Sequence, residues 1–268
     1  MKEFGIGKRV LRKEDDKLLT GNGLYMGDIN FENQLYAYVL RSPHANAKII
    51  SIETSEAKSA SGVMGVYTSN DIQIEPLPCT VDSMFEFKKR NGSKRFFPKH
   101  DVLASKYVRH VGDPVAIIVA ENLLKAKDAA ELVNVEYEIL PCVIDPEEAI
   151  KNDAYTIYQE EGADDNIAFL FNQGNKNSIE KIFNQADHIT KFKHINQRIV
   201  CNSMEPRGCI GVYHKEKETY ELYTNTQSVY RNKEVCSKQL GIKEDQLTVI
   251  CPDVGGSFGM KGMPYPEQ

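Results

Sequence analysis

Apolar positions in the first part of the chain follow the period of short β-strands. Residues 34–41 and 47–53 are rich in β-forming side chains and flank the turn-prone residues 42–44. Residues 70–105 contain several prolines and a basic stretch, which indicates a long irregular excursion on the surface. The pattern predicts a first domain built from strands at 34–41, 47–53 and 63–68, with a short helix at 55–61.

The clearest pair of elements begins with a continuous apolar run at residues 114–120. Such a run suits a strand that is buried on both faces. Asn122 can cap the helix that follows, and residues 135–139 then alternate between apolar residues and glutamate, as in a half-buried strand. This β-α-β unit closes the first domain. The helical residues expected to face the core are Leu123, Ala126, Ala130 and Val133.

A second domain is predicted to open near residue 187, after a polar connection that carries a short helix at about 178–185. The strands of a hairpin flank the polar turn 215–218, and a helix that ends at Gly241 follows the hairpin. The predicted elements are strands at 209–214, 219–224 and 247–251 and a helix at 228–240.

The order of these elements brings two segments to one edge of the predicted sheet. The strands before and after the helix should be parallel if they share a sheet. Gln227 leaves the end of the first strand and Gly255–Gly259 leaves the end of the second. Open α/β sheets bind ligands at this edge. We therefore expect both segments to face one crevice.

Composition excludes several classes of function. The chain has 268 residues, is 41% hydrophobic and 26% charged, and carries a net charge of −5, which argues against a nucleic-acid partner. The first 15 residues have no apolar core of a secretion signal, and no apolar run is long enough to span a membrane. The cysteines show no C-x-x-C spacing, so no zinc or iron–sulfur site is expected, and their scatter indicates no disulfide framework. We therefore expect a cytoplasmic protein with reduced thiols. The cysteines are at 79, 142, 201, 209, 236 and 251.

The glycine-rich run 254–262 can bring its backbone close to a ligand and turn its N–H groups toward an anion or an oxo group. It matches neither the P-loop nor the dinucleotide fingerprint, and local pattern alone favours an ordinary mobile turn. Gln227 could simply cap a helix or face water. Residues 204–207 are consistent with an ordinary turn that contains a salt bridge, and Asp253 is interpreted as a turn residue.

Taken together, several segments resemble the molybdopterin-binding large subunits of the xanthine dehydrogenase, aldehyde oxidase and carbon monoxide dehydrogenase family. The first domain matches through LLTGNGLYMGDI, YVLRSPHANAKIISIETS, VGDPVAIIVAE and DAAELVNVEYEILPCVID. The second matches through NSMEPRGCIGVY, YTNTQ and DVGGSFGMKG. The resemblance implies a mixed α+β fold: an α/β hammerhead domain at 1–146 with its core at about 18–146, a connection at 147–186, and a truncated cofactor-binding domain at 187–268.

The resemblance also implies roles for residues at the matching positions. Gln227 falls on the glutamine that lies near an oxo ligand of molybdenum in the family. The cofactor-lining loop falls on Gly255 to Lys261, with Gly256, Ser257, Phe258 and Gly259 expected to bind the cofactor. Within this loop the chain departs from the usual glycine at Ser257 and from glycine or asparagine at Met260. No direct metal ligand is expected. No catalytic residue is expected either, because the general-base glutamate is placed beyond Gln268. Gly262 replaces a glutamate of purine-oxidising members, which argues against a purine substrate.

The implied activity is hydroxylation of an aldehyde, an N-heterocycle or a similar small molecule, with water as the oxygen source. The molybdenum-pterin cofactor would be held incompletely by this chain, and electrons would leave through 2Fe-2S and FAD centres on partner chains of a hetero-oligomer. We expect no turnover from the 268 residues alone. Two alternatives stay open: a non-catalytic assembly module that binds those partners, and a nucleotide-binding domain that uses the glycine loop.

Overall fold

The computed structural model describes residues 5–7, 10–72, 74–77, 87–89, 91–94 and 96–268. Cys79 and two arginines of the predicted basic stretch, Arg90 and Arg95, lie outside the described residues. The chain divides into two compact units, one formed by Leu35–Val200 and the other by Met1–Gln34 together with Cys201–Gln268. A compact unit need not coincide with a sequence domain, so the predicted domain boundaries stay a prediction.

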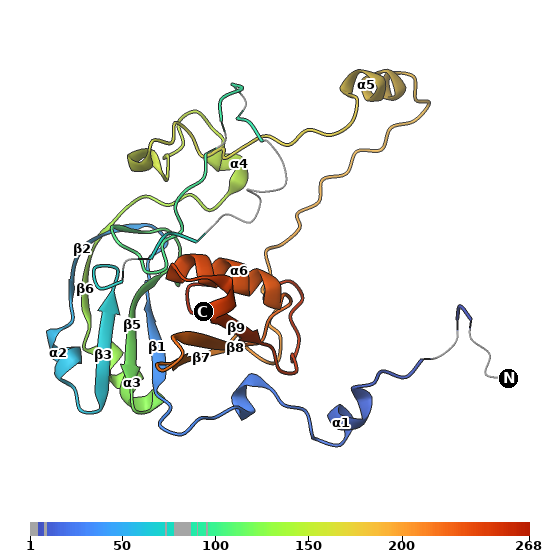
Figure 1. The fold of residues 1–268 in the computed structure, drawn as a ribbon. Helices are drawn as coiled ribbons and strands as arrows, with labels where there is room; N and C mark the ends of the chain where they lie inside the picture. Colours follow the sequence, from blue (N-terminus) through green and yellow to red (C-terminus); the bar gives the residue numbers. More distant parts are fainter. Residues whose placement is uncertain (1–4, 8–9, 73, 78–86, 90, 95) are drawn as a thin grey trace. The chain divides into compact units, whose positions relative to one another are not determined.

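The unit Leu35–Val200 contains two three-stranded antiparallel sheets (Figure 1). The apolar run predicted to be buried on both faces forms the central strand of the first sheet, and Val115, Ala116 and Ile118 are fully buried. The first sheet has the order β1 (Tyr36–Arg41), β5 (Pro114–Ala120), β3 (Val63–Thr68). The second has the order β4 (Tyr107–Val108), β2 (Ala47–Glu53), β6 (Asn134–Ile139).

The main core of this unit lies between the first sheet and α3 (Leu123–Glu131). Asn122 caps the helix as predicted, because its side chain accepts a hydrogen bond from the backbone N–H of Lys125. The predicted stripe is wrong at one position: Leu123 is exposed, and Ala129 takes its place against the sheet. The strands on either side of α3 also lie in different sheets, so the β-α-β unit is not a crossover within one sheet.

The remaining elements of this unit are short. Residues 70–105 hold no helix or strand among their described positions, as predicted. Arg109 connects the second sheet to residues that follow it in the sequence. Its guanidinium lies over the rings of Tyr107 and Tyr158 at 4.4 and 4.8 Å and donates to Glu160 at 3.0 Å. The predicted helix near 178–185 is present. These elements are α2 (Ser55–Ser59), α4 (Pro146–Ala149), η2 (Gln159–Glu161) and α5 (Lys176–Asn184).

The other unit contains the predicted hairpin and the predicted parallel crossover. β7 (Cys209–His214) pairs antiparallel with β8 (Thr219–Thr224), and β8 pairs parallel with β9 (Leu247–Ile250). α6 (Val229–Leu240) connects β8 to β9 and buries Val235 and Cys236. Ser228 caps its start, and Gly241 ends it with a left-handed φ of 66°. Shorter elements are α1 (Asp15–Leu19), η1 (Met26–Asp28) and η3 (Glu244–Gln246).

Five cysteines lie in the described part of the chain, and all five are free thiols. Burial raises the pKa of Cys209, whose thiol also lies near Glu267, and the pKa of Cys236, each to about 11. Neither thiol is therefore ionised near neutral pH. None of the described helices combines the length and the apolar character that crossing a membrane requires.

Candidate functional site

The glycine-rich loop leaves the carboxyl end of β9 with an unusual backbone. Gly256 and Gly259 have φ angles of 99° and 96°, and Phe258 has a φ of 53°. A left-handed backbone is uncommon for a bulky residue and marks a position that the surrounding loop determines. The Phe258 side chain is 76% exposed, so its own burial does not hold the loop in this shape.

Four consecutive backbone N–H groups of this loop are available to a ligand. Within the described part of the chain, no hydrogen bond is donated by the N–H of residues 256–259. The next three residues do use theirs, since Met260 donates to Ser257 and Gly262 to Gly259, and Lys261 donates to the Ser257 hydroxyl. Gly256, Phe258 and Gly259 have left-handed φ angles, and successive N–H groups in a backbone that includes left-handed residues can form a concave site for anions. The loop therefore fits a ligand rich in acceptor oxygens.

Gln227 lies beside this loop, as the predicted topology requires. Its backbone N–H donates to the Lys261 carbonyl at 2.9 Å, and its side-chain Oε1 lies 2.6 Å from the Ser257 hydroxyl. Gln227 does not cap α6, because Ser228 has that role. The prediction that both segments reach one edge of the sheet is confirmed, and Gln227 and Ser257 are in direct contact.

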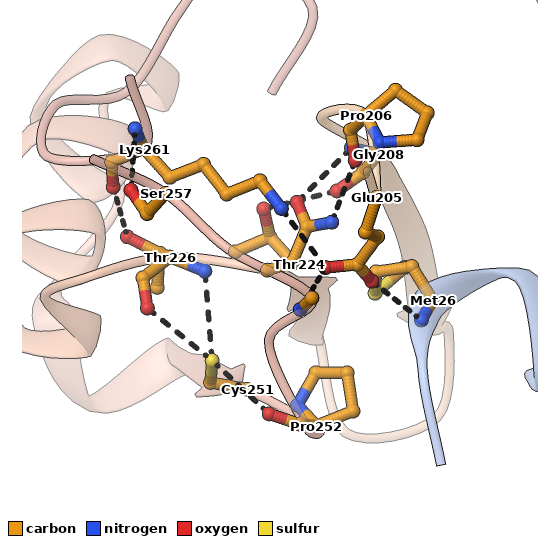
Figure 2. A network of polar contacts seen from close by, with 12 residues as sticks. Met26, Glu205, Pro206, Gly208, Thr224, Thr226, Cys251, Pro252, Ser257 and Lys261 are labelled. Atoms are coloured by element: carbon orange, nitrogen blue, oxygen red, sulfur yellow. Dashed lines mark hydrogen bonds and ion pairs between the residues drawn. The ribbon is translucent and has the colours of Figure 1, made fainter. Parts of the chain in front are cut away.

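A buried ion pair holds the far end of the loop (Figure 2). The Lys261 ammonium lies 2.9 Å from the Glu205 carboxylate, and only 1% of the Lys261 side chain is exposed. The same carboxylate accepts the backbone N–H of Gly255 at 2.7 Å and that of Met26 at 3.2 Å. A Cβ atom on Gly255 would lie 2.5 Å from the Glu205 Cβ, so the close approach requires glycine here.

These contacts set the protonation state of Glu205. Burial by itself would raise the pKa of the carboxyl. The ion pair with Lys261 and the hydrogen bonds from Gly255, Asn225 and Met26 outweigh burial and hold the pKa below its ordinary value. Glu205 is therefore ionised near neutral pH. The salt bridge expected within residues 204–207 is instead made to Lys261, and the Arg207 guanidinium lies 3.6 Å from the centre of the Tyr265 ring.

Asp253 anchors the N-terminal segment, which corrects its interpretation as a turn residue. Its carboxylate accepts the Leu24 backbone N–H at 2.9 Å and the Lys17 ammonium at 2.6 Å, while its own N–H donates to the Leu24 carbonyl at 2.8 Å. The hydrogen bond from Lys17, followed by that from Leu24, holds the pKa of Asp253 below its usual value. The segment around residues 17–26 thus contacts both carboxylates that flank the start of the loop.

Buried polar side chains at the end of β8 support the loop from below. The Thr226 hydroxyl donates to the Lys261 carbonyl at 3.1 Å and accepts from the Asn232 amide at 2.7 Å. The Asn225 side chain accepts the Gly208 N–H and donates to the Pro206 carbonyl. Sequence reasoning missed these residues, although the YTNTQ segment contains two of them. Their satisfied hydrogen bonds make a rigid support rather than a reactive centre.

Comparisons with known proteins agree over both parts of the chain. Residues 20–141 match the aldehyde oxidase and xanthine dehydrogenase a/b hammerhead domain, and residues 159–268 match the molybdopterin cofactor-binding domain. The nicotine 6-hydroxylase large subunit of Paenarthrobacter nicotinovorans is 35% identical over 98% of this chain and 31% of its own length. The carbon monoxide dehydrogenase large chain of Afipia carboxidovorans is 30% identical over 97% and 32%.

The fold is also similar to solved structures. Quinoline 2-oxidoreductase from Pseudomonas putida 86 superposes with a TM-score of 0.83 and 30% identity, over 99% of this chain and 32% of that protein. The chain thus spans about a third of the length of the relatives that it matches. The mixed α/β fold with a hammerhead domain is confirmed. The chain belongs to the molybdopterin-binding large subunits of the xanthine dehydrogenase, aldehyde oxidase and carbon monoxide dehydrogenase family.

Proposed function

We propose that this chain forms part of a molybdenum-pterin site in a subunit that oxidises an aldehyde, an N-heterocycle or a similar small molecule with water as the oxygen source. The observation that carries the proposal is the row of four unused N–H groups at 256–259 beside the Gln227 carboxamide. A cofactor rich in oxygen atoms requires hydrogen-bond donors of this kind. The loop supplies them as backbone N–H groups, which do not lose their protons or rotate away from a ligand as side chains can.

The bound cofactor would supply the redox chemistry, and the residues of this chain would hold and orient it. The N–H groups of Gly256, Ser257, Phe258 and Gly259 would donate to acceptor atoms of the cofactor, and the Gln227 amide would donate beside them. Lys261 pairs with Glu205 and is therefore not available to bind the ligand, so we assign it a structural role. The general base stays assigned to a glutamate outside these 268 residues, and we expect no turnover from this chain alone.

The partners and the location are part of the same proposal. Relatives are named as a large subunit, as the gamma subunit of a dehydrogenase complex and as the molybdenum-binding subunit of a xanthine dehydrogenase. These names support a hetero-oligomer, in which 2Fe-2S and FAD centres on partner chains would accept the electrons. We also propose a cytoplasmic location. The relatives differ in the substrates that their names give, and Gly262 argues against a purine.

The test is the molybdenum content of the intact subunit, expressed from its complete reading frame with the neighbouring genes. We expect close to one metal per chain, and a loss of metal affinity of about 10–100-fold when Gln227→Ala and Phe258→Ala are combined. Gln185→Ala is the matched control, because Gln185 is an exposed glutamine at the end of α5. A metal-free wild-type subunit would contradict the proposal and favour the non-catalytic assembly module.

A further inference from the structure

The Ser257 hydroxyl occupies a position between two groups of the candidate site. Its oxygen lies 2.6 Å from the Gln227 Oε1 and 3.0 Å from the backbone nitrogen of Lys261. Ser257 comes from the glycine-rich loop, whereas Gln227 follows β8. One hydroxyl thus joins the two segments that converge on the proposed cofactor site.

The donors and acceptors around this hydroxyl determine how the Gln227 carboxamide is turned. The Lys261 N–H can only donate, so the serine oxygen accepts there. The hydroxyl proton is donated to Oε1, the acceptor that the described residues place within hydrogen-bonding distance. The opposite orientation would set the amide nitrogen against the serine oxygen and leave the hydroxyl proton without a described acceptor. The amide nitrogen therefore keeps both of its hydrogens for other partners.

We propose that Ser257 is a positioning residue, which fixes the Gln227 carboxamide so that its Nε2 hydrogens are presented to the ligand beside the free N–H groups of the loop. This inference rests on the proposed function for the identity of the ligand. The Gln227 side chain is exposed, and only its backbone is fixed by the bond to the Lys261 carbonyl. Without the serine hydroxyl, the side chain is free to rotate and to present its carbonyl oxygen, which repels an oxygen ligand.

The orientation can be tested in the metal-free chain by NMR, with ¹⁵N in the glutamine side chains. We expect the Gln227 side-chain amide to show the heteronuclear NOE of an ordered group, unlike the exposed amide of Gln185. The signal is assigned by its loss in Gln227→Ala. Ser257→Ala and Ser257→Gly should lower the NOE to the level of Gln185, while Ser257→Thr, which keeps the hydroxyl, should retain it. Ser203→Ala removes another hydroxyl close to the loop and should change nothing.

Two NMR results would overturn the proposal. One is a Gln227 amide as mobile as that of Gln185 in the wild-type chain. The other is an unchanged NOE in both Ser257→Ala and Ser257→Gly. Dispersed backbone spectra of the two variants would verify that each chain is folded. Because no metal is needed, this measurement stands apart from the proposed function.

A second measurement addresses the ligand, with molybdenum content of the intact subunit as the readout. Ser257→Ala should lower metal retention several-fold, and adding it to Gln227→Ala should cause no further loss, because the serine acts through the glutamine. Independent, additive losses would overturn the inference even if the subunit binds metal. A wild-type subunit without molybdenum would overturn the proposed function and leave the NMR result in place.

Discussion

At the scale of single residues, the strongest constraint on the site is the charge pair of Glu205 and Lys261. Only 13% of the Glu205 side chain and 1% of the Lys261 side chain are exposed. Removing one partner leaves the other charge buried, so we expect Glu205→Gln to lower the free energy of unfolding by about 3–5 kcal/mol. Urea unfolding followed by circular dichroism measures this loss. Glu216→Gln, on the exposed hairpin turn, should change it by less than about 0.5 kcal/mol.

The combined variant Glu205→Gln with Lys261→Met separates charge from packing. It leaves no unpaired charge and should be more stable than Glu205→Gln alone. A double variant that is equally unstable would show that the loss of one of the two hydrogen bonds donated by the Gly255 and Met26 N–H groups, rather than the unpaired ammonium, accounts for the effect.

The same carboxylate predicts how stability depends on pH. Although burial opposes ionisation, the ion pair and the backbone donors hold the pKa of Glu205 in the folded chain below the unfolded value of about 4.3. The contribution of Glu205 is therefore complete above the unfolded pKa and is lost as the pH falls through the folded pKa. We expect the wild type to lose more stability than Glu205→Gln as the pH falls from about 5 to below the unfolded pKa of about 4.3. Parallel pH profiles for the two proteins would contradict this assignment.

Individual residues also show where sequence reasoning stopped. The position of Gln227 followed from the order of strand, helix and strand, because parallel strands end at one edge. The pairing of Glu205 with Lys261 did not, since 56 positions separate them and no local period connects them. Ser257 was noted only as a departure from the family. Its contact with Gln227 lies next to the turn at Phe258. The backbone there is left-handed although the residue is not a glycine, so the sequence carries no signal for the turn.

At the scale of elements, the bounds of several strands were predictable because runs of apolar or β-forming side chains lie between turn-prone residues. β2, β3, β5, β7 and β8 begin and end where the pattern placed them. Which sheet each strand joins was not predictable, because both sheets of the first unit offer similar apolar faces. The segment before β1 was missed as part of the site, since its contacts to Asp253 and Glu205 use backbone N–H groups of Leu24 and Met26, which carry no sequence signal.

The attachment of that N-terminal segment leads to a prediction for Asp253→Ala. The substitution removes the acceptor of the Leu24 N–H and the partner of Lys17, so residues 17–26 should open more often. We expect the Leu24 amide to exchange with solvent several-fold faster, because its N–H loses the carboxylate that accepts its hydrogen bond. Hydrogen exchange measured by NMR or mass spectrometry reports this directly. Asp16→Ala, an exposed carboxylate in α1, should leave the rate unchanged.

At the scale of the whole molecule, residues 187–200 form a long segment with little protection. Every one of them is exposed, and none takes part in a backbone–backbone hydrogen bond. Phe192 and Ile199 are 84% and 85% exposed, which is unusual for two large apolar side chains of one segment on a protein surface. Backbone without hydrogen bonds or packing opens at almost no cost in free energy, whereas helices and strands must unfold before a protease can bind them.

Limited trypsin digestion should therefore cut first after Lys191, Lys193 or Arg198, at least about tenfold faster than after Lys125 in α3. Mass spectrometry of the first products identifies the bond. Replacing the three basic residues by glutamine should slow the first cut by a similar factor without changing the stability of either unit. If the proposed intact subunit covers this segment, the same bonds should resist trypsin there. Early cleavage within α3 or β5 would contradict the assignment of 187–200 as a poorly protected segment, because those elements form the core of their unit.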